Sequence, residues 1–131
     1  MSAVFVDTSA ILALMVRSDR AHRSAVKAFN RLRSRQTELV TTSYVLVETY
    51  ALLDRRLGRE AVLDFRESFA PLFRVIWVDR GLHERGLDRL VKNPHSLSLV
   101  DAVSFETIRE LRILEAFAFD RHFEREGLEI R

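Results

Sequence analysis

The sequence predicts an α/β fold in which a parallel sheet is covered by helices on both faces. Short runs of β-branched and aromatic residues alternate along the chain with longer segments of helical periodicity. Strands that alternate with helices in this way favour a parallel sheet. A second observation concerns function: two isolated acidic residues close expected strands, and folds of this class gather their ligands beyond the carboxyl ends of the strands.

The composition fits one soluble domain. The chain has 131 residues, of which 47% are hydrophobic and 31% charged, so we expect a single domain over residues 1–131. Cysteine is absent, which excludes disulfides and thiolate zinc sites and is compatible with a reducing cytosol, so we expect a cytoplasmic protein. The longest apolar run, residues 10–16, is too short for a membrane span, and no leader pattern precedes it.

The N-terminal half is expected to form strands at residues 3–6 and 38–42, separated by helices at 9–16 and 19–35. Thr8 and Ser9 are expected to cap the first of these helices and Asp19 the second. Helices at 43–57 and 59–72 follow, and Gly58 between them suits a C-terminal cap.

The C-terminal half is expected to open with a strand at residues 73–78 and a helix to about residue 91 that begins at a capping Asp79. The segment Asn93-Pro94-His95-Ser96 is a strong loop signal. After it we expect a helix at 99–111, a strand at 116–119, a short helix at 121–126 and a last strand at 128–130.

Four acidic residues interrupt or end apolar stretches, namely Asp7, Glu48, Asp101 and Asp120. Asp7 and Asp120 close expected strands, whereas Glu48 and Asp101 lie in apolar helical segments. Carboxylates are almost never buried unless they are paired or bound to a cation. We therefore expect the fold to assemble these four side chains around a metal ion.

Asp101 and Ser9 can each also be interpreted as residues of a helix start. Asp101 lies near a helix start, together with Ser98, and an anion is favoured there by the helix dipole alone. Ser9 follows Asp7 closely enough to orient that carboxylate or a bound water, but a helix cap is an equally good interpretation.

The chemistry of the four acids favours a hard cation. Clustered carboxylates repel one another, and oxygen ligands without cysteine favour Mg²⁺ or Mn²⁺. The four histidines show no metal-ligand spacing, so we interpret them as surface or loop groups, with His122 as a candidate substrate contact. An acid-lined Mg²⁺ site suits hydrolysis of phosphoryl groups, because the ion neutralises phosphate charge and lowers the pKa of bound water.

A basic stripe is the remaining feature. The net charge of +2 is compatible with nucleic acid without demanding it. Basic residues at three- and four-residue steps would share one helix face: Arg17, Arg20, Arg23, Lys27 and Arg31. This face is interpreted either as solvated surface or as an RNA-binding surface, and Arg121 and His122 are further candidate RNA contacts.

Four motifs together resemble the PIN domain family, and within it the VapC-like toxin ribonucleases. They occur in the family's order and spacing over nearly the whole chain: Val6-Asp7-Thr8-Ser9-Ala10, Ser43-Tyr44-Val45-Leu46-Val47-Glu48-Thr49, Ser98-Leu99-Val100-Asp101-Ala102 and Ala118-Phe119-Asp120-Arg121-His122-Phe123. Any one motif would be weak, but the ordered set is specific. Many relatives carry Thr or Ser where this chain has Ala118, which puts one polar contact in doubt.

The resemblance implies a three-layer α/β/α sandwich with a central parallel sheet and RNA cleavage that depends on Mg²⁺ or Mn²⁺. It also implies that Asp7, Glu48, Asp101 and Asp120 form the catalytic, metal-binding cluster, with Asp7 and Asp101 as direct ligands. A small VapB-like antitoxin and a homodimer are implied as partners. The helices at residues 43–57 and 59–72 are candidate dimer surfaces or, equally, core.

Other functions fit less well. A phosphoreceiver domain would need adjacent acids at Asp7, and a haloacid-dehalogenase-type phosphatase would need a second acid where Ser9 stands. The remaining alternative is a catalytically silent PIN-like module that binds RNA or protein. That alternative gives no reason for four desolvated carboxylates, which destabilise a fold when they are left unpaired.

Overall fold

The computed structural model describes residues 2–130, without the side chains of residues 129 and 130, and it contains a five-stranded sheet. The strands are β1 (Ala3–Val6), β2 (Glu38–Thr42), β3 (Phe73–Ile76), β4 (Glu115–Phe117) and β5 (Glu129–Ile130). The helices are α1 (Thr8–Met15), α2 (His22–Ser34), α3 (Ser43–Leu57), α4 (Arg59–Ser68), α5 (Arg80–Lys92), α6 (Leu99–Leu111) and α7 (Arg121–Arg125), with a 3₁₀ turn, η1 (Ala70–Leu72). The ends of the expected 1–131 domain, residues 1 and 131, lie outside this description.

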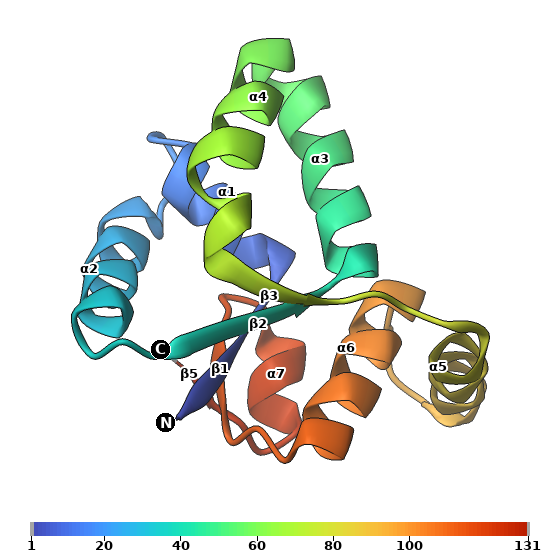
Figure 1. The fold of residues 1–131 in the computed structure, drawn as a ribbon. Coiled ribbons are helices and arrows are strands. Elements are labelled where there is room, and N and C mark those ends of the chain that lie inside the picture. Colours follow the sequence, from blue (N-terminus) through green and yellow to red (C-terminus); the bar gives the residue numbers. More distant parts are fainter. Residues whose placement is uncertain (1, 131) are drawn as a thin grey trace.

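The strands run in the order β3-β2-β1-β4-β5, and each neighbouring pair is parallel. Figure 1 shows α1, α3 and α4 on one side of the sheet and α6 and α7 on the other. The prediction of a three-layer α/β/α sandwich with a central parallel sheet is therefore confirmed. Because the chain moves outward from β1 through β2 to β3 and then returns to β4, the order reverses beside β1. In open parallel sheets ligands bind at such a switch point.

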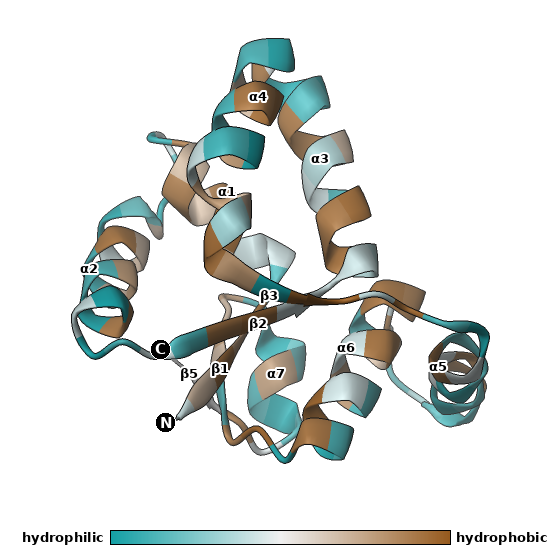
Figure 2. Cartoon of the chain, in the orientation of Figure 1, coloured by the Kyte–Doolittle hydropathy of each residue, from teal (hydrophilic) through white to brown (hydrophobic). Residues whose placement is uncertain are grey.

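The core lies on both faces of β1, whose residues Val4, Phe5 and Val6 are all buried. On the α7 side, the ring of Phe5 stacks on that of Phe123, which also meets Phe105 edge to face. Figure 2 shows hydrophobic residues along β1 and β2, whereas α5 is mainly hydrophilic. Burial on both faces explains why the strand sequence is a continuous apolar run without alternation.

Two strands end earlier than the sequence analysis expects. The expected strands at 73–78 and 116–119 stop at Ile76 and Phe117. In each case the strand ends where its inner neighbour ends, since Ile76 pairs with Thr42 and Phe117 with Val6. Two residues beyond each strand, the amides of Val78 and Phe119 donate to the hydroxyls of Ser43 and Ser9, so the chain leaves the sheet at its carboxyl edge.

Three expectations about helix ends are also corrected. Asp7, and neither Thr8 nor Ser9, caps α1, because its carboxylate accepts the amide hydrogen bond at the helix start. Asp19 accepts a hydrogen bond from the amide of Ala21 in a local turn, so α2 begins only at His22. The helix expected to reach residue 72 gives way to η1 after Phe69, since a proline inside a helix removes a backbone donor.

Two other expected caps are confirmed. Asp79 caps α5 by accepting a hydrogen bond from the amide of Leu82, and Gly58 ends α3 with a φ of 94° that disfavours other residues. Among the described residues, no helix combines the length and apolarity needed to cross a membrane.

Candidate metal centre

Asp7 is fixed at the point where β1 becomes α1. Its side chain is only 3% exposed, and its Oδ2 atom accepts hydrogen bonds from the Ser9 amide at 3.1 Å and the Ser9 hydroxyl at 2.7 Å. The same hydroxyl accepts a hydrogen bond at 2.8 Å from the amide of Phe119, just beyond β4. Ser9 therefore connects the first carboxylate to the neighbouring strand end.

Hydroxyl groups also connect this strand end to α3. The hydroxyl of Thr41, on β2, donates to the carbonyl oxygen of Val6 at 2.8 Å. The hydroxyl of Thr8 donates to the carbonyl of Val45 at 3.4 Å and accepts from the hydroxyl of Thr49 at 3.3 Å. These bonds satisfy buried polar groups and tie the start of α1 to α3.

Asp101 enters the site from the first turn of α6. Ser98 caps this helix by accepting a hydrogen bond from the Asp101 amide at 3.0 Å, and the Asp101 side chain is buried. Asp101 therefore lies in the first turn of α6, as the helix-start interpretation expected, and its carboxylate also faces the candidate site.

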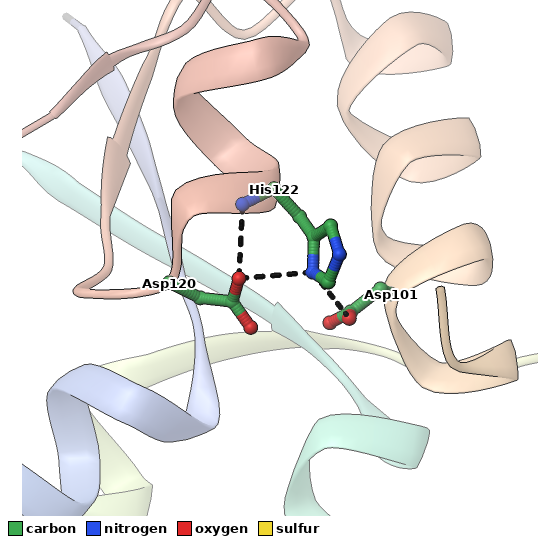
Figure 3. Close-up of side chains that lie close together, drawn as sticks. All are labelled: Asp101, Asp120 and His122. Carbon is green, nitrogen blue, oxygen red and sulfur yellow. Dashed lines mark hydrogen bonds and ion pairs between the residues drawn. The ribbon is translucent and has the colours of Figure 1, made fainter. Parts of the chain in front are cut away.

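Asp120 and His122 come from the start of α7. Asp120 caps this helix by accepting a hydrogen bond from the amide of His122 at 2.9 Å. The imidazole of His122 turns back toward its own helix start and lies between Asp120 and Asp101, as Figure 3 shows. Its Nδ1 atom is 2.9 Å from Asp120 Oδ1 and 3.5 Å from Asp101 Oδ2.

These three side chains form a compact donor set. One ligand atom from each of Asp101, Asp120 and His122 lies within 4.8 Å of the other two. The Nδ1 atom of His122 is buried, and despite its short contacts it is not aligned for a hydrogen bond with any described residue. When protonated, the imidazole is a counter-charge for both carboxylates; when neutral, its nitrogen is available as a ligand.

The two buried aspartates have raised pKa values, mainly because burial disfavours their charged forms. Burial raises the pKa of Asp7 from 3.8 to about 7; the Ser9 hydrogen bond opposes this rise, and the charges of Asp101 and Asp120 add to it. Burial also raises the pKa of Asp101 to about 6, with a further rise from the charge of Asp120. A divalent cation would favour both ionised forms and remove this penalty.

Glu48 lies at the margin of this group. It projects from α3, is half-buried, and its charge contributes to the raised pKa of Asp101, which places it near that carboxylate. Among the described residues, the compact donor set itself does not include Glu48 or Asp7. The structure thus brings the four predicted acids to one edge of the sheet, with Asp101 and Asp120 closest together.

The place of His122 among the carboxylates was not expected from the sequence. We expected the histidines to be surface or loop groups, with His122 as a candidate substrate contact; that role stays a prediction, and the structure adds that the imidazole has a ligand atom within 4.8 Å of those of Asp101 and Asp120. The Asp-x-His spacing directly after an expected strand was the available signal. An aspartate that caps a short helix brings the side chain two positions later back beside its own carboxylate.

We call Asp7, Glu48, Asp101 and Asp120 the acidic group. The predicted basic residues are not part of it. Arg23, Lys27 and Arg31 are exposed on α2, and Arg121 is exposed at the start of α7. Because α2 begins at His22, Arg17 and Arg20 lie before the helix and do not continue its face, which corrects the predicted five-residue stripe.

The donor set fits a divalent cation. It combines carboxylate oxygens with one buried imidazole nitrogen, which has ionic contacts but no aligned hydrogen bond, and it contains no thiolate. Carboxylate-rich sites suit Mg²⁺ and Mn²⁺, and an imidazole is better accommodated by Mn²⁺ than by Mg²⁺.

The fold and this acidic edge define a nuclease-like α/β domain, and comparison with known proteins places it in a family. The PIN domain profile matches residues 4–127, so the chain belongs to the PIN domain family. It is 36% identical over 131 residues to the 23S rRNA-specific endonuclease VapC20 of Mycobacterium tuberculosis, covering 98% of each chain.

Solved structures give the same picture. The crystal structure of M. tuberculosis VapC20, described as a sarcin-ricin loop cleaving toxin, superposes with a TM-score of 0.84 at 34% identity over 96% of both chains. The DNA-bound VapBC of Salmonella typhimurium matches at a TM-score of 0.71 and 18% identity, covering 100% of this chain and 98% of that one. At that identity the second match concerns the fold alone.

Proposed function

We propose that this protein is a metal-dependent endoribonuclease, built as a single PIN-like domain, and the toxin of a VapBC-type pair. The observation that carries the proposal is the convergence of Asp7, Asp101 and Asp120 at the sheet's switch point, with two pKa values raised by burial and mutual repulsion. The 36% identity to an endonuclease specific for 23S rRNA supports RNA, and ribosomal RNA in particular, as the substrate.

The site residues have different roles in the proposed reaction. Asp7, Asp101 and Asp120, with His122, would hold Mg²⁺ or Mn²⁺, which when bound neutralises phosphate charge and activates a water for attack on phosphorus. Ser9 keeps the Asp7 carboxylate aimed by its hydrogen bond of 2.7 Å. Glu48, at the margin, orients the attacking water or completes the ligand set.

The test is cleavage of a labelled RNA pool that includes 23S rRNA, with Mn²⁺ or Mg²⁺ and with EDTA. We expect cleavage that EDTA abolishes and that Asp7→Asn removes. Asn caps helices as well as Asp does, so the variant keeps its fold. Asp79→Asn is the matched control, because Asp79 also follows a strand and caps a helix but is exposed and, among the described residues, does not belong to the donor set.

The outcomes distinguish a nuclease from a catalytically silent binding module. Undiminished cleavage by Asp7→Asn would contradict the assignment of these carboxylates as the nuclease site. If well-folded wild type cleaves no RNA, calorimetry with Mn²⁺ decides: binding leaves a nuclease of narrow target range, whereas no binding favours a catalytically silent RNA- or protein-binding module.

We also propose a small VapB-like antitoxin and a homodimer as partners, in the cytoplasm. A hollow of about 650 Å³ is lined mainly by residues of α1 and α4, with His22 from the start of α2 and Leu57 from the end of α3, and it offers both apolar and charged groups to a helical segment. For the homodimer, α4 leaves Leu63 about half exposed. Sedimentation with and without a co-expressed antitoxin tests both partners.

The basic face of α2 is proposed to contact RNA phosphates. Arg23 and Lys27, one turn apart and both exposed, line one hollow together with Ser24. The double variant Arg23→Ala with Lys27→Ala should weaken RNA binding and reduce its salt slope by about 1.4, since each contact with single-stranded nucleic acid contributes ~0.7. Arg55→Ala with Arg56→Ala is the charge-matched control, and an unchanged slope in the α2 variant would make this face plain solvated surface.

A further inference from the structure

Two aromatic side chains are exposed at the same edge of the sheet as the acidic group. Trp77, one residue beyond β3, is 75% exposed, and Phe119, two residues beyond β4, is 39% exposed. The residues that precede Phe119, from Ala116 to Ala118, are all fully buried. Exposure of large aromatic rings to water is unfavourable, so two of them at a functional edge require an explanation.

Phe119 is held rigidly beside the acidic group. Its amide donates to the Ser9 hydroxyl, which in turn donates to Asp7, and the next residue is Asp120. Its ring meets the buried ring of Phe117 edge to face, with centroids 6.1 Å apart. The position of this ring is therefore fixed relative to two of the carboxylates, while a large part of its surface stays open.

Trp77 is anchored through its neighbour. The amide of Val78 donates to the hydroxyl of Ser43 at 2.9 Å, so this loop is tied to the first residue of α3. One turn further along α3, Val47 is also exposed, directly before Glu48. The loop that carries Trp77 is thus tied to the start of the helix that carries Glu48.

The strand order places Asp7, which follows β1, between the two rings, while Asp120 directly follows Phe119 beyond β4. Along the carboxyl edge, Trp77 follows β3, α3 follows β2, Asp7 follows β1, and Phe119 follows β4. Three strand spacings separate β3 from β4, which is roughly 14 Å. A nucleic acid strand that crosses this edge would meet a ring, then Asp7, and then a second ring.

We propose that Trp77 and Phe119 are base-stacking residues that hold single-stranded RNA on either side of Asp7. The proposal rests on the proposed ribonuclease function and names how that site holds its substrate. Aromatic rings stack on any base, so these residues fix the position of the strand, and discrimination between sequences arises from which bases are unpaired and free to stack.

The first test uses binding without cleavage. Trp77 is the single tryptophan of the chain, so its fluorescence reports on it alone. In EDTA, addition of a single-stranded RNA oligonucleotide should quench this emission, and a fully paired duplex should not. Phe119→Leu should weaken RNA affinity by about five- to one-hundred-fold, which is the range for the loss of one stacked base, and Phe119→Tyr should retain it.

The second test is the kinetic split in Mn²⁺. Phe119→Leu and Trp77→Leu should each raise KM with a smaller effect on kcat, because they remove binding that is common to ground and transition states. The control is Leu114→Ala: Leu114 is 78% exposed, but it precedes β4 and so lies at the opposite edge of the sheet.

The two tests separate this proposal from the nuclease assignment. Quenching by RNA that depends on Phe119, in a protein that cleaves nothing, would keep the stacking proposal and remove the nuclease. Cleavage with wild-type KM in both leucine variants, or no quenching by RNA, would overturn the stacking proposal. A Trp77 emission that changes with protein concentration, together with altered sedimentation of Trp77→Leu, would overturn it in favour of an interface between copies of the chain.

Discussion

Two carboxylates on helix α6, five residues apart, have opposite surroundings. Glu106 lies 2.7 Å from the guanidinium of Arg89, which also binds Glu126 at 2.7 Å; we call these three residues the Arg89 network. Asp101, one and a half turns earlier, has two further carboxylates and the imidazole of His122 as its charged neighbours. One helix thus carries Glu106, which is paired with a guanidinium, and Asp101, which is surrounded mainly by other carboxylates.

The pKa values show the consequence of this difference. Burial lowers the pKa of Arg89, but the hydrogen bonds and charges of Glu106 and Glu126 outweigh that effect and hold it above its ordinary value. For Asp101 burial and Asp120 act in the same direction, and the pKa rises to about 6. The acid that lacks a guanidinium partner is therefore the better candidate for binding a cation from solution.

The largest expected effect is on catalysis. Asp101→Asn should lower RNA cleavage by at least ~10²–10³-fold, because it removes a charge that stabilises the reacting centre through the bound ion. Glu106→Gln, on the same helix, should leave cleavage per folded molecule within a few-fold of wild type. Single-turnover cleavage in Mn²⁺ measures both. Equal losses in the two variants would mean that the Arg89 network and the acidic group form one functional unit.

The next effect is on stability. Arg89→Met should lower the free energy of unfolding by about 2–3 kcal/mol, less than the ~3–5 kcal/mol for a fully buried pair, because the network is partly exposed. Arg85→Met is the matched control, since the Arg85–Glu110 pair is exposed and worth about 0–1 kcal/mol. Urea denaturation gives both numbers. A folded Arg89→Met protein that no longer binds Mn²⁺ would show that the network also positions α7.

A third effect is a pH dependence of the chelated protein, which is spread over several pH units. The folded-state pKa of Asp7, about 7, lies above its ordinary value of 3.8. Its stabilising contribution is therefore complete below about pH 4 and is lost as the pH rises toward 7, by ~1.4 kcal/mol per pH unit at most. In EDTA, Asp7→Asn should consequently become more stable relative to wild type as the pH rises from 4 to 8.

Thermal or urea unfolding of both proteins across that pH range measures the effect. Addition of Mn²⁺ at pH 8 should stabilise wild type and reverse the order, because a ligand that binds only the folded state raises its stability. Parallel pH curves for wild type and Asp7→Asn would contradict the raised pKa of Asp7.

Much of the fold could be predicted because the signals are local. The apolar run at β1, the caps at Asp79 and Gly58, and the 3.6-residue periodicity of the helices each depend on residues within a few positions of one another. The four isolated acids were conspicuous for the same reason: a charge inside an apolar stretch is visible in one dimension. The sequence by itself thus determined the element types, the α/β/α class and which carboxylates to examine.

The tertiary structure decided what depends on neighbours distant in the chain. The ends of β3 and β4 are set by where β2 and β1 end, since an unpaired strand residue has no ladder to join. The strand order β3-β2-β1-β4-β5 brings Trp77 and Phe119 to either side of Asp7 along the carboxyl edge. His122 belongs with Asp101 because α6 and α7 lie on the same face of the sheet. Periodicity encodes which residues are buried, whereas ligand geometry requires contacts that only the packed chain creates.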